Sequence, residues 1–150
     1  MTSLARVAEL AAPENWLAVL VTIRPSGTPS VSVVNAGIVA DPVTGEQVVA
    51  FVAVGDTAKL ANLRRNPHAT LVFRSTWEWV AVHGTARIAG PDDPLPGLAP
   101  AAVPQLLRDI YHAAGGTHPD LDEYDRQMVA DRRAAVLLTP QRFSTNPGNG

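Results

Sequence analysis

Apolar residues along this chain fall mostly into short runs of the length that β-strands have. Six runs have this character, at residues 16–23, 29–40, 48–54, 69–74, 77–88 and 134–144. The first reads as a buried strand, because nearly every position in it is apolar. The first three runs follow one another with only turn-forming residues between them, which favours an antiparallel sheet, since parallel strands need a long crossover.

Helix signals lie between and around these runs. Ser3, Thr57 and Asp120 are N-cap residues, Pro67 stops a helix, and Gly115 can close one. The helices are expected at residues 4–12, 58–65, 104–114 and 121–133. This order of elements excludes a doubly wound parallel sheet and predicts a small antiparallel barrel with helices attached.

Length and composition narrow the class of protein. The 150 residues, 46% hydrophobic and 17% charged against about 25% in an average protein, predict one folded domain over 1–150. A net charge of −2 argues against a nucleic-acid partner, and no apolar run is long enough to span a membrane. The absence of cysteine excludes disulfides and thiolate sites, and the four histidines share no ligand spacing, so no metal site is expected. We expect a soluble, cytoplasmic protein.

One basic side chain differs from the rest. Lys59 is the single lysine beside eleven arginines, and it lies in the first turn of the helix that Thr57 begins. Free N–H groups and the positive end of the helix dipole favour an anion there, so Lys59 is a candidate phosphate ligand. The alternative is that the single lysine stands at this position by chance. Arg64 and Arg65 on the same helix either extend a positive patch along a groove or form a solvated helix end.

Polar and aromatic residues in the strands supply further candidates. Asn35 interrupts an apolar run, and a buried amide needs a partner, which is either a bound ring or the backbone at a kink next to Gly37. Trp77 and Trp79 share a strand face with His83, and indoles at this spacing belong either to the core or to a binding groove. No dinucleotide fingerprint, P-loop or nucleophile elbow is present.

Two stretches carry a resemblance to a known family. The run Lys-Leu-Ala-Asn-Leu-Arg-Arg-Asn-Pro-His-Ala at 59–69, placed after the third strand, resembles the split β-barrel proteins of the pyridoxamine phosphate oxidase-like superfamily. Residues 77–84, 122–124 and 128–133 resemble its actinobacterial branch, the B-type deazaflavin-dependent reductases that use coenzyme F420. The resemblance implies an antiparallel six-stranded split β-barrel that forms a homodimer, with the cofactor groove at the subunit interface.

The same resemblance implies a function and a set of site residues. The function is hydride transfer from reduced coenzyme F420 to a small electrophilic molecule such as a quinone or an enone. An FMN-dependent oxidoreductase, or a non-catalytic carrier of cofactor or haem with His83 at the groove edge, is the alternative. No catalytic residue is assigned, and Val52 stands where the family often has a hydroxyl. The expected cofactor-binding residues are Ser32, Val34, Asn35, Ala36, Val52, Thr57, Ala58, Lys59, Asn62, Arg64, Trp77 and Trp79. The partner-chain wall of the groove is expected from Tyr124, Met128, Asp131, Arg132 and Arg133. For Asp131 and the arginines, a structural ion pair is the alternative.

Overall fold

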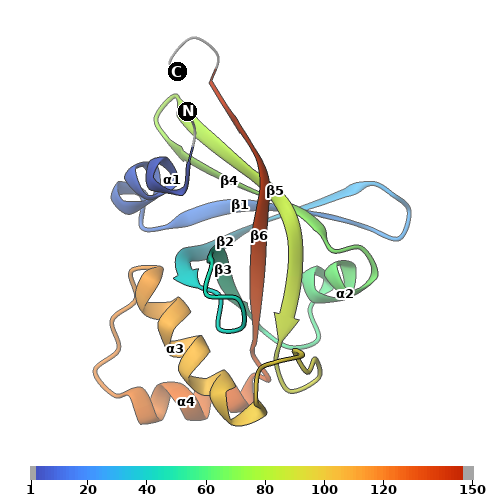
Figure 1. Cartoon of the computed structure of the whole chain (residues 1–150), viewed down its shortest axis with the longest axis vertical. Helices are drawn as coiled ribbons and strands as arrows, with labels where there is room; N and C mark the ends of the chain where they lie inside the picture. The colour runs from blue at the N-terminus through green and yellow to red at the C-terminus, as the bar shows by residue number, and fades with distance from the viewer. Residues whose placement is uncertain (1–2, 147–150) are drawn as a thin grey trace.

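The computed structural model describes residues 3–146 as a closed antiparallel barrel with strand order β1-β2-β3-β6-β5-β4 (Figure 1). The strands are β1 Leu17–Ile23, β2 Pro29–Ala40, β3 Gln47–Ala53, β4 His68–Ser75, β5 Glu78–Ala89 and β6 Ala134–Thr145. The helices are α1 Leu4–Ala11, α2 Ala58–Arg65, α3 Val103–Ala113 and α4 Leu121–Ala130, with 3-10 turns η1 Ala12–Glu14 and η2 Pro100–Ala102. The prediction of a six-stranded antiparallel barrel with attached helices is confirmed.

Two apolar clusters hold the molecule together. Inside the barrel, alternate residues of the strands meet, among them the fully buried Leu20, Phe51 and Phe73. Outside it, α3 places Leu107 and Ile110 against the outer face of β3 and β6, and α4 packs beside α3 (Figure 1). No helix within residues 3–146 is long and apolar enough to cross a lipid bilayer.

The helices leave one part of the barrel uncovered. On the outer face of β1 and the first half of β2, Leu17 is 49% exposed, Val19 36%, and Val31 and Val33 63% each. Val19 pairs directly with Val33, so these side chains form one continuous apolar face. The prediction that the first apolar run is a buried strand is therefore wrong for the outward-facing Leu17 and Val19, because α3 packs on the second half of β2 and on β3 and β6 and leaves β1 uncovered.

Three predicted boundaries differ from the structure for one shared reason. Trp16 has a φ of 58°, so β1 begins one residue later than predicted. Thr76 has a φ of 54°, and Trp77 lies in the turn before β5 rather than in the strand. Arg132 has a φ of 50°, and α4 ends at Ala130 rather than near residue 133. Left-handed residues interrupt each regular element, with Asn15 beside Trp16 before β1, and side-chain pattern carries little signal for them.

Candidate functional site

A groove of about 520 Å³ opens between the outer face of the barrel and the two helices that pack on it. β2 and β3 contribute small and apolar side chains, including Val33 and Val52. The start of α2 contributes Thr57 and Lys59, and Arg133 enters from the segment before β6. The remaining lining comes from α3, α4 and the loop between them.

The lining carries positive charge and no carboxylate side chain. Lys59 has no ion-pair partner among residues 3–146. Arg133 contacts Asp131 at 3.2 Å, and Asp131 also accepts a hydrogen bond from Gln127 at 2.9 Å. The hydrogen bond from Gln127, together with the Arg133 guanidinium, lowers the pKa of Asp131. The groove therefore suits an anionic ligand.

The start of α2 offers free backbone donors in this groove. Thr57 is the N-cap residue by position, yet its hydroxyl donates to the carbonyl oxygen of Val54 at 3.0 Å and caps no N–H group. The N–H groups of the first turn are thus open to an acceptor from outside the chain. Together with the half-buried Lys59, they form a seat suited to a phosphate.

Gly55 brings the two cationic residues of the groove into one place. A Cβ atom on Gly55 would lie 2.7 Å from the carbonyl oxygen of Arg132, and the Gly55 N–H donates to the carbonyl of Asp131 at 3.1 Å. The loop between β3 and α2 therefore rests on the turn between α4 and β6. Only glycine permits this approach, which holds Lys59 and Arg133 along the same groove.

Asn35 joins three parts of the chain at the edge of the groove. Its Nδ2 atom donates to the carbonyl oxygens of Ala114, at 2.9 Å, and Asn15, at 3.0 Å. Two residues on, a Cβ atom on Gly37 would lie 2.6 Å from the backbone of Ala113, so α3 packs directly on β2. Asn35 is exposed rather than buried, and its amide nitrogen fixes the end of α3 beside the groove.

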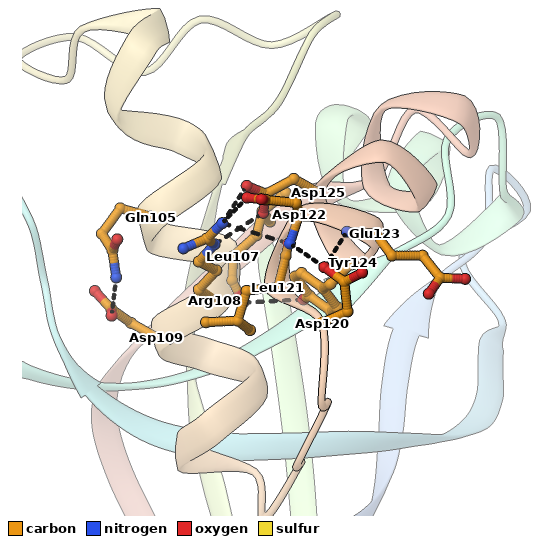
Figure 2. Close-up of polar contacts among 10 residues, drawn as sticks. All are labelled: Gln105, Leu107, Arg108, Asp109, Asp120, Leu121, Asp122, Glu123, Tyr124 and Asp125. Atoms are coloured by element: carbon orange, nitrogen blue, oxygen red, sulfur yellow. Dashed lines mark hydrogen bonds and ion pairs between the residues drawn. The ribbon is translucent and has the colours of Figure 1, made fainter.

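The α3–α4 pair that forms the groove wall is held by polar contacts (Figure 2). Arg108 on α3 donates to both carboxylate oxygens of Asp125 on α4, at 2.9 and 2.5 Å. Asp120 accepts from two N–H groups at the start of α4, at 3.1 Å each, as its N-cap position predicts. The helices thus form a rigid unit that the barrel carries.

Aromatic residues of this unit face the groove. The rings of Tyr111 and Tyr124 lie 4.7 Å apart, and His118 lies 6.1 Å from Tyr124. Burial raises the pKa of Tyr124 to about 12, and its hydroxyl donates to the Leu107 carbonyl at 3.1 Å. Tyr111, His118 and Gln127 were not predicted as site residues, because Tyr111 fits an apolar helix stripe and no motif surrounds the other two.

The predicted site residues divide into two groups. Those that line the groove are Val34, Asn35, Val52, Thr57 and Lys59, and Tyr124, Met128 and Arg133 of the same chain join them. Of the others, Ala58 is the exposed first residue of α2, Ser32 is half-buried on β2, and Ala36 is fully buried inside the barrel.

The remaining predicted residues have other neighbours. Asn62 is buried and donates to the Thr22 hydroxyl at 3.2 Å, while Arg64 binds Asp93 through two hydrogen bonds of 2.8 and 2.6 Å. Arg65, the other arginine of α2, donates at 2.7 Å to the carbonyl oxygen of residue 23. These contacts hold α2 on the barrel, and they engage both arginine side chains within the chain.

The two tryptophans, Trp77 in the turn before β5 and Trp79 on β5, lie apart from the groove lining. Trp77 and Trp79 border a separate hollow beside β4. His83 also lies on β5, and its two ring nitrogens lie 2.9 Å from the Thr70 hydroxyl and 2.8 Å from the Ser144 hydroxyl. Burial lowers the pKa of His83. No cluster of three potential metal ligands occurs in the described part of the chain.

Several solved structures have the same fold as this chain. A conserved hypothetical protein of Mycobacterium tuberculosis, Rv2991, is 18% identical with a TM-score of 0.69, over 97% of this chain and 84% of that one. An F420 reductase is 18% identical with a TM-score of 0.58, over 87% and 90%. A pyridoxamine 5'-phosphate oxidase-related, FMN-binding protein of Nostoc punctiforme is 16% identical with a TM-score of 0.63, over 95% and 81%.

At these identities the solved structures establish the shared fold only. The family comes from the sequence itself, in which residues 6–146 match the model of the pyridoxamine 5'-phosphate oxidase family. That match spans the whole barrel together with the α2 segment and the α3–α4 unit that border the groove. On this basis, the chain belongs to the pyridoxamine 5'-phosphate oxidase family.

Proposed function

We propose that this chain is an oxidoreductase that uses coenzyme F420 to reduce a small electrophilic molecule such as a quinone or an enone. When bound, the reduced deazaflavin supplies a hydride to the substrate. The observation that carries the proposal is the acid-free groove in which Lys59 and the uncapped start of α2 face the same space. Structural neighbours include an F420 reductase and an FMN-binding protein, which supports a flavin-like ligand.

The residues that would hold the cofactor follow from the lining. Lys59 and the N–H groups of the first turn of α2 bind its phosphate. Val33 and Val52 offer an apolar floor for the ring, and Asn35 lies at the edge of that floor. Arg133 lies beside the groove, where it would have to exchange Asp131 for the anionic tail. Arg64 reaches the tail only by exchanging Asp93 for it, so its part is secondary.

The rest of the groove serves the substrate and excludes water. Tyr111 and Met128 line the groove from the helix wall, where they would shield a bound ring from water. No carboxylic acid lines the groove, but His118 and Tyr111 also carry protons there, so the proton that completes the reduction comes either from solvent or from a side chain of the lining. For this reason no side chain is assigned as a general acid.

The exposed apolar face of β1 and β2 supports a homodimer. Burial of one valine side chain stabilises an interface by about 1.5–3 kcal/mol, and four large apolar residues gather on this face. Val33 belongs both to this face and to the groove, so a second copy would border the groove. In such a dimer Trp77 and Trp79 are proposed to act at the partner's groove.

The dimer is tested by sedimentation at micromolar concentration. Val31→Asp places a charge in the middle of the exposed face and outside the groove lining, and we expect a monomer. Val43→Asp is the matched control, because Val43 is 42% exposed in the turn between β2 and β3. A monomeric wild-type protein, or two variants that both remain dimers, would refute this interface.

Binding is tested by titrating the purified apo protein with coenzyme F420 and with FMN, followed by fluorescence. We expect F420 to bind more tightly, and Lys59→Ala to weaken it by 10-fold or more, about 1.4 kcal/mol. Arg126→Ala is the matched control, since Arg126 is an exposed cation of α4 outside the lining. Tighter FMN binding favours the FMN-dependent alternative, and binding of neither refutes the proposal.

Turnover separates an enzyme from a carrier. The F420-loaded protein is mixed with a panel of quinones, enones and nitroaromatic compounds, and the oxidation of the cofactor is followed by absorbance. We expect at least one class to be reduced with multiple turnovers. Tight F420 binding without turnover on the panel would support a carrier instead.

A further inference from the structure

A second pocket lies on the other side of α4 from the groove. Its volume is about 430 Å³, within the range of small-molecule sites. The loop of residues 90–99 forms one side, and α3 and α4 form the others. The side chains that line it are mostly apolar: Leu95, Leu98, Val103, Leu107, Met128 and Val129.

The loop over this α4 pocket is built to keep its shape. Four prolines, at positions 91, 94, 96 and 100, restrict its backbone. Arg64 on α2 donates two hydrogen bonds to Asp93, and Arg132 after α4 forms an ion pair with Asp92. Gly90 and Asp93 also exchange two backbone hydrogen bonds, of 3.0 and 3.2 Å. A loop tied to two helices holds the pocket open in advance of a ligand.

Every charged side chain in the lining already has a partner within the chain. Asp93 is paired with Arg64 and Asp125 with Arg108. The lining arginines, 132 and 133, are paired with aspartates 92 and 131. An ionised ligand would lose part of its hydration here and find no unpaired counter-charge, whereas a neutral apolar ligand would bury apolar surface without that cost.

The α4 pocket and the groove share part of their walls. Met128 and Arg133 line both cavities. Methionine has an unbranched, flexible side chain that adapts to different neighbours. A ligand in the pocket would therefore sit against the same residue that borders the groove.

We propose that the α4 pocket is a second ligand site, which binds a neutral, ring-containing apolar small molecule. The apolar lining favours such a ligand, the paired charges select against ions, and the volume accommodates a fused two-ring system. The inference goes beyond the proposed function, since it holds whichever cofactor the groove takes.

The charge preference is tested with two probes that share one ring framework. N-phenyl-1-naphthylamine is neutral, and 1-anilinonaphthalene-8-sulfonate adds a single negative charge. Each is titrated into the full-length protein and followed by its fluorescence. We expect the binding that the pocket-filling substitution Leu98→Trp removes to be at least 10-fold tighter for the neutral probe than for the sulfonate, since any sulfonate held in the cationic groove remains bound in that variant. Equal affinities would overturn the proposal, because they would indicate general adsorption to apolar surface.

The location is tested with two tryptophan substitutions on the same loop. Leu98→Trp fills the pocket and should weaken the neutral probe at least 10-fold. Ala99→Trp adds the same bulk at an exposed neighbour outside the lining and should leave the affinity within 2-fold. Val129→Trp, at the exposed rim, replaces Leu98→Trp if that variant does not fold. Unchanged probe binding in the filled variant would overturn the proposal, and cofactor titration of the same variant reports separately on the groove.

Discussion

Asn35 allows a direct test of how the helix wall is fixed beside the groove. Its Nδ2 atom makes two hydrogen bonds of 3.0 Å or less, to the carbonyls of Asn15 and Ala114. A net contribution of about 0.5–1.5 kcal/mol per bond predicts that Asn35→Ala lowers the free energy of unfolding by about 1–3 kcal/mol. Asn35→Asp, which keeps the shape but turns an oxygen toward those carbonyls, should cost more.

The assay is chemical denaturation of the apo protein at one fixed protein concentration, because association with a second copy would also change the apparent stability. For a chain of this length, about 1 kcal/mol corresponds to a shift of roughly 2–4 °C in Tm. Ser30→Ala on the same strand is the control, since no side-chain hydrogen bond involves it among the described residues. If both Asn35 variants unfold like the wild type, Asn35 does not position α3. A contact with the ligand would then be the remaining reason for a polar residue at this place in the strand.

Three further predictions concern backbone packing and titration. Gly37→Ala should destabilise the protein by about 1–3 kcal/mol in denaturation, because its Cβ would lie 2.6 Å from the backbone of Ala113; unchanged stability would show that α3 shifts freely. Gly55→Ala, whose Cβ would lie 2.7 Å from the Arg132 carbonyl, should weaken cofactor binding more than 3-fold in the fluorescence titration, and wild-type affinity would refute the role of this contact. The Tyr124 pKa is raised from 10 to about 12, so its stabilisation is complete below pH 10 and is lost as the pH rises toward 12; unfolding measured between pH 9 and 12 should show a steeper loss in the wild type than in Tyr124→Phe, and parallel curves would contradict it.

Local sequence signals were enough to predict the elements and their order. Alternation, turn residues and N-caps predict all six strands and the four α-helices, and Ser3 and Asp120 cap their helices as expected. These signals are local, because each depends on hydrogen bonds or side-chain spacing within a few residues. The missed boundaries at residues 16, 76 and 132 are left-handed backbone positions, which depend on the path that the chain must take to its next element.

Tertiary structure decided which residues meet. Lys59 was identified from its place in a helix turn, but its pairing in one groove with Arg133, 74 positions later, depends on the close contact that Gly55 allows. Sequence also could not tell that Arg64 is held by Asp93, or that helices cover β3 and leave β1 open. Contacts between distant segments depend on how the barrel closes and where α3 packs, and no local pattern records them.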